Sequence, residues 1–424
     1  MARLSDPAVR REVARHAVEI HPDFGLAYVE FDDQGRLWNR SQVELLARTL
    51  EAEVRRSEGG GVGVIVLAHG WEHDARVCDE NVACFRALLA QIAAETAEAA
   101  HLTGSRPLRI VGVYCGWRGR SMTFPVVDAL SFWARKRAAE RIGAGELVEV
   151  LAYLDRFVRH ENEDGRFAGL TVIGHSFGGT MVYTALANTL KARMIDAYEQ
   201  RGRVPVADNV VRGFGNLVVL VNPAFEASAY APLHDLAEAI GTFPPRQTPI
   251  LVVVGSETDF SNRVWFPMGR KIDVLTQRTG PRSERPLLTT AIGWYDPFTT
   301  HRLEAIGRSG AAPPKTHVDA CRCSLPVDEL PPEETRQLAD FLRTRRLSDA
   351  DASSEAGAAC AQGQALGTAR LTCLPGTSPT TPVWSIRASD EVVHGHSGFF
   401  TRPFLDFLRY VMIDGFSRAA KVAQ

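Results

Sequence analysis

The stretch LTVIGHSFGG, residues 170–179, carries the strongest structural signal in this chain of 424 residues. Its first four residues predict a buried strand, and the following run TMVYTALA, residues 180–187, predicts a helix. Ser176 therefore lies in a sharp turn between strand and helix. Because Gly174 and Gly178 carry no Cβ, strand and helix can pass close together there, and we expect a strained backbone at the serine itself.

A serine exposed by such a turn is a candidate nucleophile. Its hydroxyl proton is normally held too tightly for attack. A neighbouring general base can remove that proton, while backbone N–H groups take up the charge that develops on the substrate oxygen. The pattern around Ser176 predicts this chemistry, and the alternative interpretation is an ordinary strand-to-helix turn that happens to contain a serine.

Strand-like and helix-like runs alternate on both sides of the turn. Strands are predicted at residues 26–31, 62–67, 108–114, 170–173, 217–221, 250–254 and 383–386. Helices are predicted at residues 41–56, 81–99, 124–142, 146–159, 179–198 and 402–413. This alternation predicts an α/β fold with a mostly parallel sheet and helices on both faces. Active sites in such sheets lie at the carboxyl ends of the strands, where Ser176 is expected.

Candidate partners for Ser176 lie downstream in the chain. The segment GSETD follows a predicted strand and supplies two acidic residues, Glu257 and Asp259. The segment HGHS follows the last predicted strand and supplies two histidines, His394 and His396, ahead of the last helix.

These motifs resemble those of the α/β-hydrolase superfamily and, within it, the esterase-like and lipase-like serine hydrolases. The resemblance rests on LAHGW at residues 67–71, GHSFGG at 174–179, GSETD at 255–259 and GHS at 395–397, within residues 25–259 and 380–415. It implies that the nucleophile, the acid and the histidine follow one another in that order along the chain. The long gap between the acid and the histidine departs from the family and implies an insertion that affects the substrate pocket.

The resemblance also implies a role for each candidate. Ser176 is the nucleophile, His396 the general base and Asp259 the acid of a catalytic triad. We favour His396 over His394 because the Gly-His-Ser run before a helix resembles the family's histidine loop. We favour Asp259 because aspartate is the commoner acid and the loop is short, and Glu257 stays open as the alternative.

The family implies an oxyanion hole built from backbone N–H groups. Carried over to this chain, the two donors are Trp71, in the turn after an early strand, and Phe177, which follows the nucleophile. We expect His69 to have a structural role, in which it bridges two loops by hydrogen bonds. The residues that could line a pocket are His69, Gly70, His175, Trp117 and Arg118.

The chain divides into four predicted segments. They are a first part of the core with an N-terminal extension at residues 1–259, a cap or lid at 260–347, a flexible linker at 348–370, and the last part of the core at 371–424. The cap contains six aromatic residues that we expect to shape an apolar pocket: Phe260, Trp265, Phe266, Trp294, Tyr295 and Phe298.

The cysteines and histidines do not predict a metal site. Zinc sites favour two cysteine pairs with two to four residues between the ligands. The Cys-x-Cys run at residues 321–323 is tighter than that, and His301, Cys360 and Cys373 lie far from it in the sequence. We therefore expect no metal, and either buried free cysteines or an incidental disulfide.

Composition narrows the class of protein further. The net charge is −2 and no basic stripe is present, which argues against a nucleic-acid partner. No apolar run approaches the length of a membrane span, and the first residues do not resemble a secretory signal. Seven scattered cysteines without such a signal favour the cytoplasm.

The expected function is hydrolysis of a small-molecule carboxylic ester, without a cofactor. The alternatives are amidase, lactonase or thioesterase action on the same fold, or a non-catalytic receptor or scaffold, because a fold does not determine a substrate. The sequence leaves the physiological substrate and the oligomeric state open.

Overall fold

A computed structural model describes residues 17–71, 73–117, 128–280, 284–307 and 360–419, with short pieces at 317–319, 322–325, 335–336 and 338–339. Its centre is an open sheet of 11 strands in the order β1-β2-β4-β3-β5-β6-β7-β13-β8-β12-β11. A second sheet pairs β9 (His317–Asp319) with β10 (Arg322–Ser324) in antiparallel fashion.

The middle of the main sheet is parallel. Its parallel strands are β2 (Phe24–Phe31), β4 (Arg109–Trp117), β3 (Val62–Ala68), β5 (Ala168–His175), β6 (Leu217–Val221), β7 (Leu251–Ser256), β13 (Val383–Ala388) and β8 (His301–Ala305). Every residue of β3, β5, β6 and β7 is buried, which explains their continuous apolar runs. Antiparallel strands close the two edges: β1 (Val18–Ile20), β12 (Ala369–Cys373) and β11 (Gln364–Leu366).

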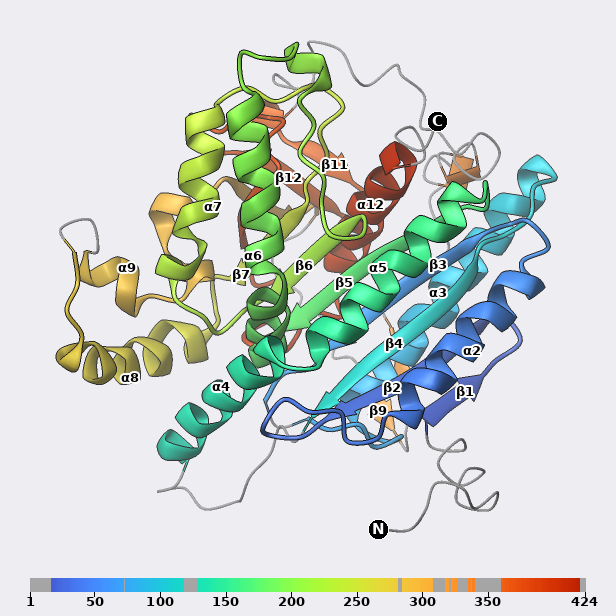
Figure 1. Cartoon of the computed structure of the whole chain (residues 1–424), viewed down its shortest axis with the longest axis horizontal. Helices are drawn as coiled ribbons and strands as arrows, with labels where there is room; N and C mark the ends of the chain where they lie inside the picture. The colour runs from blue at the N-terminus through green and yellow to red at the C-terminus, as the bar shows by residue number, and fades with distance from the viewer. Residues whose placement is uncertain are drawn as a thin grey trace.

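Helices cover both faces of the sheet (Figure 1). One face packs against α2 (Ser41–Arg56), α4 (Asp128–Ala144), α5 (Leu147–Glu163), α6 (Phe177–Gln200) and α7 (Ala227–Ile240). The other face packs against α3 (Glu80–Thr103) and α12 (Arg402–Ala419). The predicted α/β architecture with a mostly parallel sheet is therefore confirmed. Among the described helices, none combines the length and the apolar character needed to cross a bilayer.

The predicted cap and linker contribute strands to the main sheet. Residues 301–305 form β8 beside β13, with Leu303 opposite Ala388. Residues 364–366 and 369–373 form β11 and β12, which continue the sheet beyond β8. The prediction of a cap over 260–347 is therefore wrong for residues 301–305. The prediction of a flexible linker over 348–370 is wrong for the residues that form β11 and the start of β12. Edge strands are short and alternate between buried and exposed residues, as β12 does, so their apolar signal is weak.

Residues 260–280 and 284–300 form short helices beside α7, at the left of Figure 1. In chain order they are the π-helical turn η2 (Ser261–Trp265), the helix α8 (Phe266–Asp273), the 3₁₀ turn η3 (Val274–Thr276), the helix α9 (Arg285–Thr289), and the 3₁₀ turns η4 (Ile292–Trp294) and η5 (Asp296–Phe298). A further 3₁₀ turn, η1 (Val206–Asp208), lies earlier in the chain, between α6 and β6. The aromatic residues of this segment divide into two groups, because Phe266 and Phe298 are buried whereas Phe260 and Trp265 are exposed. A shared aromatic pocket therefore stays a prediction.

Disulfides connect several segments. Among the described residues, Cys78, Cys84, Cys323, Cys360 and Cys373 are disulfide-bonded. Cys84 bonds to Cys323 and so attaches β10 to α3, and Cys360 bonds to Cys373. The expectation of buried free cysteines holds for Cys115, whose thiol pKa is raised by burial to about 12. Disulfides are rare in reducing compartments, so this pairing gives no support to the cytoplasmic location, which stays a prediction.

Candidate active site

Ser176 lies at the carboxyl end of β5, where α6 begins. Its backbone has φ 55° and ψ −118°, a region that side-chain-bearing residues rarely adopt. A Cβ on Gly178 would overlap the carbonyl of Ala68 at the end of β3, so only glycine allows α6 to start this close to the sheet. The strained serine and the close helix–strand approach that the sequence predicts are both present.

Ser176, His396 and Asp259 form a hydrogen-bonded relay. The hydroxyl of Ser176 lies 2.7 Å from Nε2 of His396, and Nδ1 of the same ring lies 2.9 Å from Oδ1 of Asp259. Asp259 is fully buried, and the side chain of His396 is 22% exposed. The carboxylate selects the tautomer with its proton on Nδ1, which leaves Nε2 free to accept the serine proton.

The two alternative candidates lie outside this relay. Nδ1 of His394 is 3.0 Å from the carboxylate of Asp390, and the His394 side chain is 61% exposed. The carboxylate of Glu257 accepts the backbone N–H of Asp390. In the described part of the protein, neither side chain hydrogen-bonds to Ser176 or His396.

Two donors hold the backbone carbonyl of His396. They are Nε2 of His175 and Nδ2 of Asn222, each at 2.8 Å. Burial, and secondarily the neighbouring His396, keep the pKa of His175 well below its usual range, so its ring is neutral and donates its single proton from Nε2. Asn222 is itself fixed, because its Oδ1 accepts the N–H of Ser256 at 2.8 Å. His175, predicted only as a possible pocket residue, thus positions the loop that carries His396.

Asn262 holds the acid. Its backbone N–H donates to Oδ1 of Asp259 at 3.1 Å, and its Nδ2 donates to Oδ2 at 2.8 Å and to the carbonyl of Asn222 at 2.9 Å. Asn262 is 2% exposed, so water does not replace these bonds readily. Neither asparagine is among the site residues predicted from the sequence, although Asn222 directly follows β6 at the carboxyl edge of the sheet, where functional side chains gather.

We predict that Asn262→Ala lowers kcat of any hydrolysis that this relay catalyses by roughly 10- to 100-fold with little change in KM, because the carboxylate loses a donor and shifts relative to His396. The matched control is Asn209→Ala, which also removes a buried amide whose Nδ2 donates to a backbone carbonyl, that of Ala197. Steady-state kinetics and thermal melts are measured on both variants. Equal kcat in the two would show that Asn262 only stabilises the fold.

The chain after β3 lies against Ser176. A Cβ on Gly70 would come within 2.9 Å of Cβ of Ser176 and 2.8 Å of Nδ1 of His175, so glycine is required there. The N–H of Trp71 has no hydrogen-bond acceptor among the described residues. The N–H of Phe177 opens α6 and therefore has no acceptor within that helix. The role of these two N–H groups as oxyanion donors stays a prediction.

His69 connects two loops beside the site. Its Nδ1 donates to the carbonyl of Gly70 at 2.8 Å, and its Nε2 accepts the N–H of Trp117 at 3.0 Å. The indole N–H of Trp117 donates in turn to the carbonyl of His69 at 3.0 Å. Burial lowers the pKa of His69 to about 4, so the ring is neutral at pH 7. These contacts match the structural role expected for His69. Arg118 lies outside the described residues.

Aromatic rings connect the candidate oxyanion residues to α8. The ring of Phe132 lies 5.9 Å from that of Trp71 and 4.8 Å from that of Phe177, measured between centroids. The next residue, Trp133, lies 6.1 Å from Phe266 on α8. Aromatic rings therefore pack against the side chains of both candidate oxyanion residues.

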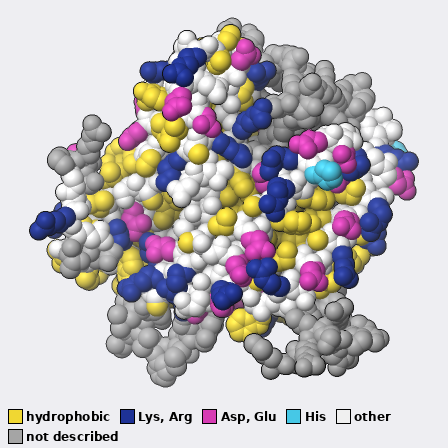
Figure 2. All heavy atoms as spheres, viewed as in Figure 1, with side chains coloured by type: hydrophobic (Ala, Val, Ile, Leu, Met, Phe, Trp, Pro, Cys, Tyr) yellow, Lys and Arg dark blue, Asp and Glu magenta, His cyan; other side chains and the backbone are white. Residues whose placement is uncertain are grey.

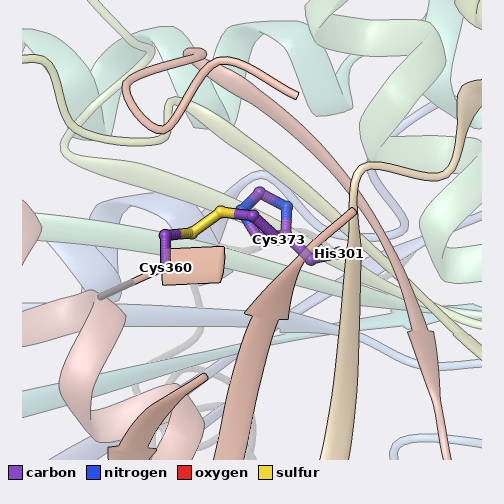
Figure 3. A group of neighbouring side chains, drawn as sticks. All are labelled: His301, Cys360 and Cys373. Atoms are coloured by element: carbon purple, nitrogen blue, oxygen red, sulfur yellow. A yellow bond between two sulfur atoms is a disulfide. The ribbon is translucent and has the colours of Figure 1, made fainter. Parts of the chain in front are cut away.

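His301, Cys360 and Cys373 lie together although they are distant in sequence (Figure 3). Their potential ligand atoms lie within 4.8 Å of one another. The two sulfurs form a disulfide and so are not the thiolates that zinc requires. His301 is buried, its Nε2 has no partner among the described residues, and burial lowers its pKa to about 3. Of the three side chains, only that of His301 keeps a free ligand atom, and a single ligand does not form a metal site.

No protein-family profile and no curated protein matches this chain. Among solved structures, the chain is similar to phospholipase PlaB from Legionella pneumophila in complex with thio-NAD, with 13% sequence identity and a TM-score of 0.22 over 59% of this chain. The chain spans about half the length of that phospholipase, 47% of which is covered. A likeness this weak assigns neither a family nor a substrate, so any functional conclusion depends on the geometry of the site.

Proposed function

We propose that this protein is a serine hydrolase with an α/β-hydrolase fold, which cleaves a carboxylic ester through an acyl-enzyme. The observation that carries the proposal is the relay itself. The hydroxyl of Ser176 is 2.7 Å from Nε2 of His396, whose Nδ1 is 2.9 Å from the buried carboxylate of Asp259. All three residues follow the carboxyl ends of parallel strands, where the active sites of α/β sheets lie.

The geometry supports a two-step acyl transfer. Oγ of Ser176 attacks the ester carbonyl while Nε2 of His396 takes the hydroxyl proton, and His396 then gives that proton to the departing alcohol. Asp259 keeps the imidazole in the productive tautomer and stabilises the imidazolium that forms. The N–H groups of Trp71 and Phe177 bind the oxyanion. Water then attacks the acyl-enzyme with the same assistance from His396, releasing the acid and restoring Ser176.

The surroundings favour a substrate with an apolar part. Phe132 packs between the rings of Trp71 and Phe177, the two residues whose N–H groups would face the substrate oxygen. Apolar walls with a few fixed polar groups are typical of small-molecule sites. We therefore propose a small-molecule ester with a hydrocarbon acyl or alcohol group.

The proposed function is tested with p-nitrophenyl esters of graded acyl length and the matching p-nitroanilides. We expect turnover of the esters, a dependence of kcat/KM on acyl length, and an initial burst of p-nitrophenol close to the enzyme concentration if deacylation is slower than acylation. Preferential cleavage of the anilides would identify an amidase instead. A chain that turns over neither series and does not react with a fluorophosphonate would be a non-catalytic receptor or scaffold.

A further inference from the structure

The helical segment around α8 presents an apolar stripe to solvent. The side chains that form it, called the α8 stripe below, are Trp265, Met268, Ile272 and Leu275, which are 52%, 55%, 72% and 68% exposed. Their spacing of three, four and three residues places them on one face of a helix. A helix at a protein surface normally turns charged and polar side chains outward, so contiguous large apolar groups indicate an interaction surface.

The other face of α8 is already packed against the protein. Phe266 is fully buried against Trp133, and Gly269 lies directly beneath the Trp133 ring, where a Cβ would overlap the indole. Nε of Arg270 pairs with the carboxylate of Glu226 at 2.8 Å. The helix is therefore anchored by its inner face, and the α8 stripe is a second, outward-facing apolar surface.

The α8 stripe lies at the active-site end of the molecule. The π-helical turn η2 leads from the candidate acid, Asp259, directly into α8. In Figure 1, α8 lies toward the same lower left side as the carboxyl ends of β4 and β5. Figure 2 shows hydrophobic side chains at that edge of the molecule. A partner that covered the stripe would therefore lie toward the same end of the parallel strands as the relay.

Positive charge accompanies the stripe. Residues 260–280 contain four basic side chains and one acidic side chain, Asp273. Of the basic residues, Arg263, Lys271 and Arg278 are exposed. An exposed apolar stripe with exposed basic groups in the same segment matches an anionic phospholipid surface, where phosphates lie outside the acyl chains. A second copy of the same surface would instead bring like charges together.

We propose that α8 docks this protein on anionic phospholipid surfaces. The α8 stripe enters the boundary between headgroups and acyl chains, and Arg263, Lys271 and Arg278 bind the phosphates. This inference goes beyond the proposed hydrolysis and does not require it, because docking makes no use of the reactivity of Ser176. If the chain is an ester hydrolase, docking would bring the relay to a lipid-borne substrate.

The test is cosedimentation of the full chain with vesicles, in the Ser176→Ala background so that lipid is not consumed. Vesicles of equal parts phosphatidylglycerol and phosphatidylcholine are compared with vesicles of phosphatidylcholine alone. We expect binding to the anionic vesicles that weakens as salt increases. In the double variant Met268→Ser/Ile272→Ser, the affinity for the anionic vesicles should fall by roughly 100-fold. Each large apolar side chain that no longer enters the lipid is expected to lower the affinity by about tenfold or more.

The matched control is Ile195→Ser/Tyr198→Ser on α6, which removes two apolar residues that are 44% and 40% exposed away from α8. It should bind like the parent, and thermal melts should show that both double variants are folded. Equal binding by the stripe variant and the control would overturn the proposal, as would a parent that fails to bind anionic vesicles. A parent that fails to bind and dimerises in light scattering, with the stripe variant monomeric, would identify a second copy as the occupant. Because every variant lacks Ser176, a failure of the proposed hydrolase function leaves these results unaffected.

Discussion

Replacing Ser176 with alanine is expected to abolish fluorophosphonate labelling and to lower kcat for ester hydrolysis by on the order of 10³-fold or more. The variant keeps the turn but loses the only hydroxyl that hydrogen-bonds to His396 in the described part of the protein. Labelling is measured by intact-mass spectrometry after reaction with the probe, and kcat with the best p-nitrophenyl ester of the graded series. We expect a single adduct per chain in the parent protein.

His396→Ala should be as damaging as Ser176→Ala, because members of a relay act as a unit and their effects do not add. The matched control is His394→Ala, which removes a second histidine from the same loop. His394 pairs with Asp390 at the surface, so its loss should change kcat by less than about threefold. If labelling survives in Ser176→Ala, or if His394→Ala is the inactive variant, the assignment of nucleophile or base is wrong.

The relay could be found from sequence because each member lies next to a buried strand. Ser176 follows β5 and Asp259 follows β7, two strands whose residues are all buried, and His396 lies in the loop after β13, which is buried except for Arg387. Parallel strands bring their carboxyl ends to one edge, so residues that are 137 and 220 positions apart in the chain meet there. Local pattern and sheet topology together determined this part of the site.

The residues that support the relay could not be found in this way. Asn262 acts through two side-chain bonds and one backbone bond whose partners depend on how the loops after β6 and β7 approach each other. The disulfide between Cys84 and Cys323 joins segments that are 239 residues apart, and no local pattern predicts that pairing. The helix α7 is not among the predicted elements, and it contains Pro232, a residue that normally indicates the end of a helix.

The second large effect is expected for Asp259→Asn, which should lower kcat by on the order of 10³- to 10⁴-fold while the protein stays folded. The measurement is kcat with the same ester, together with a thermal melt. The matched control is Glu257→Gln, the neighbouring acid that the sequence left as an alternative. Its exposed carboxylate receives only the backbone N–H of Asp390 among the described residues, so kcat should change by less than about threefold.

The size of the Asp259→Asn effect follows from the donors that surround the carboxylate. Oδ1 accepts from Nδ1 of His396 and from the backbone N–H of Asn262, and Oδ2 accepts from Nδ2 of Asn262. An asparagine has one oxygen, so in either orientation its NH₂ group faces a donor. Oriented toward His396, the NH₂ group favours the tautomer with the proton on Nε2, which cannot accept the proton of Ser176. Oriented the other way, it faces the amide NH₂ of Asn262 in a buried site, which is costly. Near-normal turnover in Asp259→Asn would mean that the imidazole does not depend on this carboxylate for its tautomer, and the role of the acid would then have to be sought at Glu257.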